Sequence, residues 1–460
     1  MHRSLAGVAI TIAAAAGLTA APASAADDLT GRLLVTLRDA PGREDGKPRA
    51  VASAVRAVAS AAGVRPAGTP LAALRVAPVR PAAGVPAREA ARRLRADPRV
   101  ARVEVERRAQ LRYVPNDPGF TTPDERAADG RPAQWYLQRH GFPAAWDVAR
   151  GVGARIAVID SGVDINHPDV GPRVVERADF DGTRGHGGAE VDEVGHGTHV
   201  ASLACAVADD SRGIAGAGFA CDLLVAKSDL SDFSVAQSIT WAVQNKADAI
   251  VMSFGTTGEQ PASSVVFRAL EDAYASGVIL VAAAADEPVE EQGDPANVLQ
   301  PTGTGANLDA GRGLSVTAAG DDDRRAPFAG RGSQISLAAY GTLRSGSRDG
   351  LLAAFPGQTT DIERGSLFGP APCNCRQPFA GDSRYAYLQG TSMSAPVVAG
   401  AAALVRRLNP DLTLAEVLRL MKETARNQNW DPETGWGVMD AAQAIAQARV
   451  MDRRPPRSRA

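Results

Sequence analysis

The sequence GTSMSAP at residues 390–396 sets the fold and the chemistry that we expect of this chain. A small, flexible residue precedes a serine, and a proline and an Ala-rich apolar run to Leu408 follow. This pattern predicts a tight loop leading into a helix over 395–408, with Ser392 at or just before the helix start. A helix N-terminus presents unpaired N–H groups and the positive end of its dipole, which can stabilise an oxygen anion. Ser392 is therefore a candidate nucleophile for attack on a carbonyl, provided that another residue takes its proton.

The first 25 residues have the three parts of a secretory signal peptide. His2 and Arg3 give a positive start, residues 5–18 are apolar, and residues 23–25 (Ala-Ser-Ala) form a small-x-small cleavage site. No other uncharged apolar run reaches the length that spans a bilayer. We therefore expect a secreted, extracellular protein without stable membrane association.

The charge of the chain is distributed unevenly. Residues 26–112 contain 18 Lys and Arg against 9 Asp and Glu, which gives about +9, whereas the whole chain carries −2. Residues 113–460 therefore carry about −12, because the first 25 residues add +1. Opposite charges of this size favour association of the two parts. The Arg residues of the basic part are spread through apolar patterning rather than clustered, so we expect no nucleic acid as a partner.

The basic part predicts a small α+β domain. Its apolar periodicity gives strands over 32–37, 71–79 and 100–106 and helices over 50–62 and 87–96. Two helices alternating with strands in about 80 residues suit a ferredoxin-like unit.

The segment that follows, residues 107–131, loses this periodicity and collects Pro, Asp and Gly. It predicts a linker and a plausible zone for proteolytic cleavage.

The rest of the chain predicts an α/β fold. Continuous apolar strands alternate with helices, as in a parallel sheet that is covered on both faces. Functional groups gather at the carboxyl ends of such strands, where we expect Asp160 and Ser253. The predicted strands are 155–160, 222–227, 249–253 and 278–284, and the predicted helices are 234–245, 264–276 and 395–408.

Two further motifs offer Ser392 a base and a group to orient that base. Asp160 ends an apolar strand, so its carboxylate is shielded and fixed, as is needed to hold a His in one tautomer. Taken alone, Asp160 is better interpreted as an N-capping or turn residue. His196 lies in GHGTHVA (195–201), where glycines allow close approach and an apolar helix follows. A metal-binding interpretation of His196 and His199 fails, because no acidic residue occupies the HExxH position.

Together the three motifs closely resemble those of the subtilisin-like serine proteases, or subtilases. AVIDSG (157–162), GHGTHVA (195–201) and GTSMSAP (390–396) follow in the order Asp, His, Ser, which is the order of subtilisin. The resemblance covers about residues 113–449. It implies a three-layer α/β/α fold with a mostly parallel sheet, preceded by a small ferredoxin-like α+β propeptide domain. The implied domains are a signal peptide (1–25), an inhibitory propeptide (26–112), a peptidase domain (113–449) and a disordered basic tail (450–460).

The resemblance also implies a function. The chain is expected to be a secreted serine endopeptidase, made as a zymogen, that hydrolyses peptide bonds through an acyl-enzyme. Ser392 would be the nucleophile, His196 the base and later the acid, and Asp160 the residue that orients His196. The expected partners are protein or peptide substrates and the chain's own propeptide, as intramolecular inhibitor and folding assistant, and the expected state is a monomer.

The substrate cleft carries two departures from the family. Ser253, Phe254 and Gly255 match the strand edge that pairs with extended substrate, and Ala283, Ala284 and Ala285 match the opposite wall. Ala285 replaces the usual Gly, which should narrow the pocket. Asp286 replaces the Asn that donates to the oxyanion beside the N–H of Ser392, and an ionised Asp cannot donate. We therefore expect an attenuated or acid-shifted protease; the alternative is a catalytically silent subtilase-fold protein that binds peptides or a partner.

The resemblance further implies a structural Ca²⁺ site of the kind found in thermitase-like members. Hard oxygen ligands suit this ion, and the alternative interpretation is a solvated acidic loop. The implied ligands are the side chains of Asp117, Asp169 and Asp210 and the carbonyls of Val207, Arg212 and Ile214.

Four cysteines permit two disulfides in an exported chain. A bond between Cys205 and Cys221 would close a short loop. Cys373 and Cys375 would form a tight ring, remain a free pair or bond elsewhere. They lie in residues 341–387, a segment that is long for its position and to which the sequence assigns no function.

Overall fold

The computed structural model describes residues 29–38, 48–82, 85–107, 113–182, 187–256, 258, 263–344, 350–365 and 373–451. The predicted signal peptide and residues 452–460 of the predicted tail lie outside them. The chain forms two compact units, residues 1–111 and 112–460. None of the helices in the described ranges combines the length and the apolar character that a membrane span requires.

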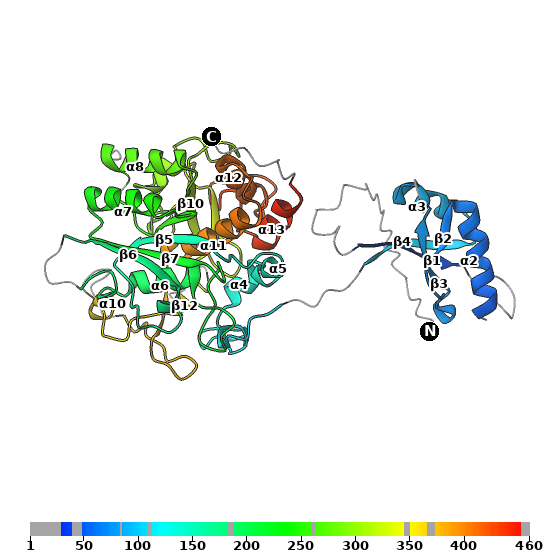
Figure 1. Ribbon diagram of the computed structural model, residues 1–460, viewed down its shortest axis with the longest axis horizontal. Helices are drawn as coiled ribbons and strands as arrows, with labels where there is room; N and C mark the ends of the chain where they lie inside the picture. The colour runs from blue at the N-terminus through cyan, green and yellow to red at the C-terminus, as the bar shows by residue number, and fades with distance from the viewer. Residues whose placement is uncertain are drawn as a thin grey trace, which may run out of the picture. The chain divides into compact units, whose positions relative to one another are not determined.

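The first unit is a four-stranded antiparallel sheet with two helices, as Figure 1 shows in blue and cyan. Apolar residues of both helices and of the strands, among them Val35, Val55 and Leu94, form its core. The strand order β2-β3-β1-β4 is that of a ferredoxin-like unit. Its elements are β1 (Leu29–Leu37), α2 (Pro48–Ala62), β2 (Val64–Pro66), β3 (Val76–Pro81), α3 (Ala87–Ala96) and β4 (Val100–Arg107).

One predicted strand of this unit is wrong at its start. Residues 72–74 form a 3₁₀ turn, and Arg75 adopts a left-handed backbone conformation with φ 52°. The strand therefore begins only at Val76. An apolar run alone did not reveal the turn, because Leu71 and Leu74 are exposed rather than buried.

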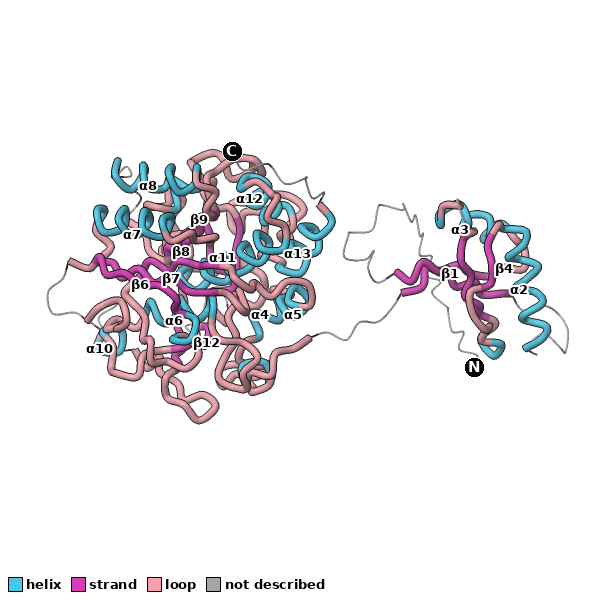
Figure 2. The backbone as a smooth tube through the Cα atoms, in the orientation of Figure 1, coloured by secondary structure: helices cyan, strands magenta, loops and turns pink. Residues whose placement is uncertain are grey.

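The second unit contains a seven-stranded sheet in the order β11-β10-β9-β8-β5-β7-β6, in which every pair is parallel. Figure 2 shows these strands in magenta between helices. The strands are β5 (Arg155–Asp160), β6 (Val174–Phe180), β7 (Asp222–Ser228), β8 (Ala249–Met252), β9 (Ile279–Ala283), β10 (Leu314–Ala319) and β11 (Leu337–Tyr340).

Helices cover both faces of this sheet, which confirms the predicted three layers. Alternate residues of β5 pack in opposite directions: Ile156 and Val158 join one core, and Ala157 and Ile159 join the other. The first core includes α6 (His196–Cys205) and α11 (Thr391–Leu408), and the second includes α7 (Asp232–Gln244) and α8 (Ser264–Ala275). Strand β5 is apolar along its length because both of its faces are buried.

The predicted linker is wrong beyond residue 112. Asp117, Phe120 and Asp124 are buried in the second unit. Gly119 N donates to Gly213 O at 2.8 Å, so this segment is tied to the loop after α6. Its Pro, Asp and Gly residues form a 3₁₀ turn (Pro118–Phe120) and tight bends instead of a flexible connection.

The C-terminal part ends in two further helices. α12 (Leu414–Glu423) begins with a capping box formed by Thr413 and Glu416, and α13 (Ala441–Val450) begins with Asp440 as its N-cap. The predicted tail starts two residues too early at 450, because Val450 is the last residue of α13 and Asn409 Nδ2 donates to Met451 O at 3.4 Å. Two short helices, α4 (Trp135–Arg139) and α5 (Phe142–Trp146), precede β5.

The long segment 341–387, in the residues that the structure describes, packs against α6. It contains the antiparallel strands β12 (Leu351–Ala354) and β13 (Tyr385–Leu388) and the short helix α10 (Asp361–Arg364). The buried His199 of α6 contacts the carbonyls of Leu351 and Ala386 through Nε2, both at 3.2 Å. Burial lowers the pKa of His199 to about 3, as suits a neutral packing residue.

The structure contains two disulfides, Cys205–Cys221 and Cys373–Cys375. The first joins the end of α6 to the residue before β7, with the two Cα atoms 5.8 Å apart. The second lies within the segment after α10.

Candidate active site

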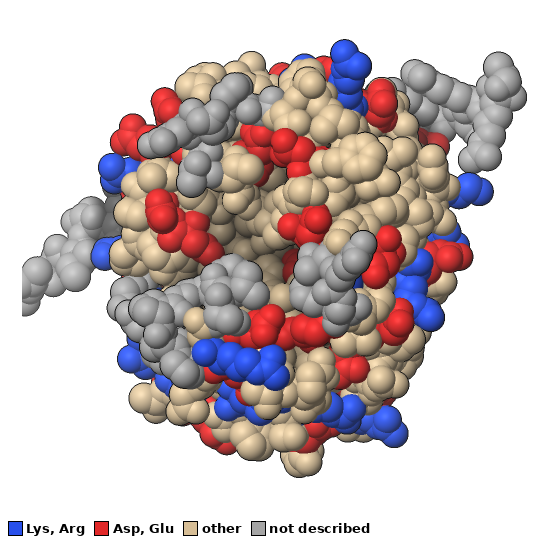
Figure 3. Space-filling view, turned by 90° about the vertical axis from the view of Figure 1, so that its left-hand side faces the viewer, with Lys and Arg blue, Asp and Glu red and all other residues tan. Residues whose placement is uncertain are grey.

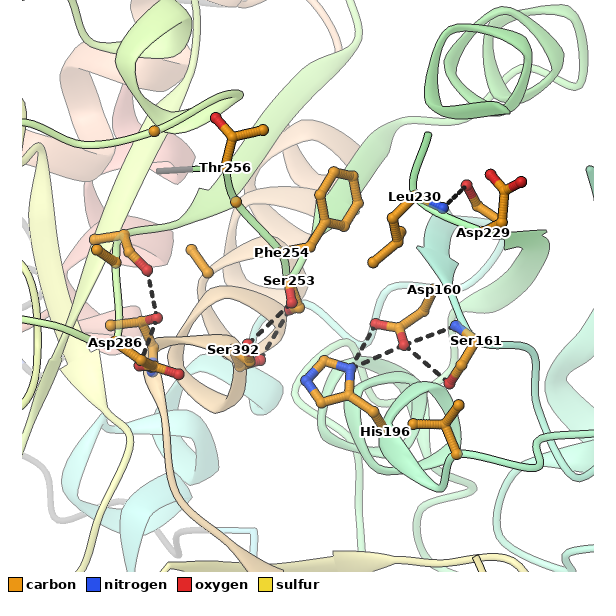
Figure 4. A pocket seen from close by; sticks show the side chains of 18 of the residues that line it. Asp160, Ser161, His196, Asp229, Leu230, Ser253, Phe254, Thr256, Asp286 and Ser392 are labelled. Carbon is orange, nitrogen blue, oxygen red and sulfur yellow. Dashed lines mark hydrogen bonds and ion pairs between the residues drawn. The ribbon is translucent and has the colours of Figure 1, made fainter. Parts of the chain in front are cut away.

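The candidate residues lie at the carboxyl ends of the central strands. Asp160 ends β5, Ser253 follows β8 and Ala283 ends β9. Together with His196 and Ser392, they line a cavity of about 870 Å³. Figure 4 shows His196 between Asp160 and Ser392, with Phe254 and Leu230 facing one another beside them. A parallel sheet brings these sequence-distant residues to one edge.

Asp160 and His196 are joined directly. His196 Nδ1 lies 2.8 Å from Asp160 Oδ1 and 3.0 Å from Oδ2. Ser161 N donates to Asp160 Oδ1 at 2.8 Å and fixes the carboxylate. Burial favours the neutral imidazole, but the charge and hydrogen bond of Asp160 outweigh it, so the pKa of His196 lies above its usual value. An imidazole held in this way is suited to accept a proton.

Ser392 lies in the first turn of α11, since the helix begins at Thr391 rather than at the predicted Ala395. Its Oγ donates to Ser253 O at 2.9 Å, and Ser253 Oγ donates to Ser392 O at 2.9 Å. Pro396 explains the second bond. A proline has no N–H with which to close the helical bond to the residue four before it, so the Ser392 carbonyl is left for Ser253. Ser392, the predicted nucleophile, is thus fixed to the strand edge after β8.

Asp286 lies beside the N-terminus of α11. Its Oδ1 accepts hydrogen bonds from Thr391 N at 2.8 Å and Thr391 Oγ1 at 3.0 Å. Gly390 itself makes no side-chain cap, so Asp286 supplies the acceptor that a helix start requires. The side chain is exposed to the cavity. Loss of hydration among the surrounding protein atoms raises the pKa of Asp286 above its usual value. The hydrogen bonds from Thr391 act in the opposite direction but are outweighed.

Asp192 is a buried carboxylate that lies outside the three sequence motifs. Its oxygens accept from Gly195 N, Thr198 N and Ser161 Oγ at 2.8 Å each, and from Thr198 Oγ1 at 2.7 Å. It therefore caps the start of α6 and supports the same Ser161 that binds Asp160. Burial raises its pKa to about 6. An acidic residue four before His196, at the expected start of a helix, was the available signal.

The segment 350–365 also holds the chain before His196. Gln358 Nε2 donates to Asp192 O at 2.9 Å, and Asp361 N donates to Glu193 O at 2.8 Å. A Cβ at Gly195 would come within 2.6 Å of the Phe355 ring, too close for two carbon atoms. Gly195 also has φ 95°, a backbone conformation that favours glycine. A side chain at residue 195 would therefore be excluded both by its backbone and by Phe355. Part of the long segment thus acts as a support for the candidate site.

The predicted metal ligands are only partly brought together. Asp117 and Asp169 are buried, and each keeps one oxygen, Oδ1, without a hydrogen-bond partner. Asp209 N donates to Asp117 Oδ2 at 2.8 Å, and Ile214 N donates to Asp169 Oδ2 at 3.0 Å, so both carboxylates adjoin the loop 207–214. Burial raises the pKa of Asp117 to about 6 and that of Asp169 to about 7. A bound cation would offset this cost of burying charge.

The other predicted ligands contribute less. Asp210 Oδ1 accepts from Arg212 N at 2.9 Å, and Tyr385 OH donates to Asp169 Oδ2 at 2.8 Å. In the described part of the chain, no group of three or more His, Cys, Asp or Glu side chains is arranged to hold a metal. A cation at Asp117 and Asp169 would therefore need main-chain carbonyls from the loop, such as those of Val207, Arg212 and Ile214. The two orphaned oxygens fit such an ion.

Comparison with known proteins gives consistent matches. The model of the subtilase family matches residues 151–437. Thermitase of Thermoactinomyces vulgaris is 31% identical over 303 residues, which cover 64% of this chain and 85% of thermitase. An extracellular protease of Xanthomonas campestris pv. campestris is 29% identical over 378 residues, 73% of this chain and 57% of that protein. The solved structure of a protease from Pseudoalteromonas arctica matches with a TM-score of 0.58 at 27% identity, covering 73% of this chain and 100% of that chain.

Proposed function

The chain belongs to the subtilase family and is a serine-type endopeptidase, and on this premise we propose that Asp160, His196 and Ser392 form its catalytic triad. The observation that carries the proposal is the Asp160–His196 pair at 2.8 Å beside Ser392 at the start of α11. In the reaction, the Ser392 hydroxyl turns from Ser253 O toward His196 and transfers its proton to the imidazole as Oγ attacks the substrate carbonyl. His196 then protonates the leaving amine, and water hydrolyses the acyl-enzyme by the same path.

Stabilisation of the oxyanion in the tetrahedral intermediate is the step for which this site is least well equipped. The N–H of Ser392 in the first turn of α11 is one donor for it. Asp286 stands where a second donor is expected, and as an anion it repels the developing charge instead. We propose that the protease is attenuated when Asp286 is ionised.

The first unit is proposed to be an inhibitory propeptide, which makes the chain a secreted zymogen and its mature form a monomer. The ferredoxin-like strand order and the excess of Arg in residues 26–112 support this role, since the rest of the chain is acidic. The disulfides Cys205–Cys221 and Cys373–Cys375 support an oxidising, extracellular location.

A catalytically silent, peptide-binding subtilase is the second candidate. Asp286 favours it, because its carboxylate is turned to Thr391 and offers no donor to an oxyanion while ionised.

Labelling with a serine-directed fluorophosphonate separates these two functions. The secreted protein is expected to be labelled, because the Asp160–His196 pair activates Ser392, and Ser392→Ala is expected to abolish labelling. N-terminal sequencing of both proteins should show that only the active one removes its front unit, near residue 113. An unlabelled, fully folded protein would establish the silent alternative.

We further propose a structural Ca²⁺ at Asp117 and Asp169. The ion would add positive charge between two buried carboxylates and link the segment around Asp117 to the loop 207–214. It would stabilise the second unit and take no part in the reaction.

Removal of this ion is expected to lower the melting temperature by several degrees, because a ligand at 100 times its Kd contributes about 2.7 kcal/mol. Melting would be followed by circular dichroism with Ca²⁺ and with EDTA. Asp169→Asn should melt at the same temperature in both, whereas Asp229→Asn, a variant remote from the loop, should keep the difference. A wild-type melting point that EDTA leaves unchanged would refute the site.

A further inference from the structure

Carboxylates outnumber the other charged residues in the lining of the cavity at Ser392. Figure 3 shows acidic residues around a hollow in the surface. The described lining contains eight Asp and Glu residues and one Lys, namely Asp160, Asp181, Glu193, Asp229, Asp286, Glu287, Glu291, Asp361 and Lys227. A concave site with such an excess of one charge attracts ligands of the opposite charge.

Some of these charges are already engaged within the protein. Asp160 binds His196, and Arg364 Nη1 lies 3.1 Å from Asp361 Oδ1. The Lys227 side chain is buried and its Nζ donates to Glu193 Oε2 at 2.6 Å, as well as to two main-chain carbonyls. Lys227 therefore neutralises Glu193 and has no charge left for the rest of the cavity.

Glu287 and Glu291 differ from these residues. Both are exposed, both line the cavity, and neither forms an ion pair with a residue in the described ranges. Glu290 lies between them, outside the lining, and pairs with Arg331 at 3.3 Å. The loop after Ala285 thus places Glu287 and Glu291, which form no ion pair in the described ranges, in the lining of the cavity. It keeps Glu290, which is paired with Arg331, outside that lining.

This loop is fixed against the strand edge next to the nucleophile. Thr256 N donates to Asp294 O at 2.9 Å. Ala285 N donates to Gln292 Oε1 at 2.9 Å, which fixes the other end of the loop. A Cβ at Gly258 would come within 2.5 Å of Glu291 O, and a Cβ at Gly293 would come even closer to Thr256 O, so the chain on both sides of Gln292 lies close to the segment that begins with the strand edge. A pocket lies next to Ser392 between residues 253–256 and the wall formed by residues 283–285. The two glutamates therefore border this pocket.

We infer that this pocket selects peptides with Lys or Arg immediately before the scissile bond, an inference that rests on the proposed function. The aliphatic stem of such a side chain would pack on Ala284 and Ala285, and its cationic end would meet Glu287 and Glu291. Ala285 adds a methyl group to the wall, which favours a slender, unbranched chain over an aromatic ring. The substrate class is therefore cationic protein segments.

The test uses fluorogenic peptides that differ only in the residue before the cut. Citrulline is the matched control for Arg, because it has nearly the same shape and no charge. Mature protein at low salt should cleave the Arg and Lys peptides with a kcat/KM about tenfold or more above that of the citrulline peptide, and salt should reduce the difference. Equal rates for Arg and citrulline would overturn the inference.

Variants assign the effect to the two glutamates. Glu287→Gln and Glu291→Gln should each lower the ratio of kcat/KM for the Arg peptide to kcat/KM for the citrulline peptide about fivefold. Glu290→Gln, the matched control, should retain the full preference. If both pocket variants keep it as well, the pocket does not act through these residues and the inference fails.

Fluorophosphonate labelling of Ser392 in the same samples distinguishes a failure of the proposed selectivity from a failure of the proposed protease function. A labelled protein that cleaves neutral and cationic peptides equally leaves the protease standing and refutes only the selectivity. A protein that is neither labelled nor active on any peptide refutes the proposed function, and this inference with it.

Discussion

Asp286→Asn is expected to raise kcat about 10²- to 10³-fold above neutral pH, a magnitude known from loss of the equivalent donor in subtilisin rather than calculated for this chain. An Asn at this position can keep its Oδ1 on Thr391 and turn its amide toward the oxyanion. The wild-type carboxylate accepts the same bond from Thr391 N at 2.8 Å but has no proton to donate when ionised.

The pH dependence of this gain follows from the sign of the shift. Because the pKa of Asp286 lies above its usual value, the protonated, donating form persists to higher pH than in an ordinary Asp, and it disappears as the pH rises through that pKa. The gain should therefore grow with pH. Peptide hydrolysis would be followed for the wild type, Asp286→Asn and Asp286→Ala, the last of which removes the charge without adding a donor. No advantage of Asn over wild type above neutral pH would contradict the assignment.

If Asp160 orients His196 as proposed, Asp160→Asn is expected to lower kcat by about 10⁴, the loss known for the corresponding Asp to Asn change in a Ser-His-Asp protease. The amide can no longer accept from His196 Nδ1 with a full charge, so the imidazole adopts the wrong tautomer. The negative charge of Asp160 also holds the pKa of His196 up. The acid limb of the pH–rate profile should consequently move to lower pH in the variant.

The neighbouring Asp164 offers a matched control for this change. It is also buried, but its oxygens accept from the main chain at Asn166 and Gly357 and do not contact His196. Asp164→Asn should therefore leave the position of the acid limb unchanged. An Asp160→Asn variant with less than a tenfold loss would show that His196 is oriented by other groups.

The sheet and its order of functional residues could be predicted because burial left a clear pattern. Strand β5 is apolar over its whole length and was predicted with the bounds that it has, Arg155–Asp160. Helix α3 was likewise predicted as Ala87–Ala96, because polar and apolar residues alternate with helical period. The spacing of apolar residues is enough to predict a strand or helix where that spacing matches the face that the segment buries.

Contacts between distant segments could not be predicted in this way. The segment around Asp117 looks like a linker, and only its contact with the loop 207–214 gives it a fixed structure. Helix α11 starts before its proline because Asp286, from another loop, caps it at Thr391. Glu287 and Glu291 look like ordinary solvated residues, and their place in the cavity depends on the fold of the loop that carries them.

The parallel order of the large sheet has a consequence for how the molecule folds. Asp160 and His196 are 36 residues apart, and Ser392 lies 139 residues beyond the Ser253 that fixes it. Contacts of such long range form slowly, since a large loop must close before any of them is rewarded. The candidate site is therefore complete only once these long-range contacts have formed, including the one that joins α11 to the strand edge after β8.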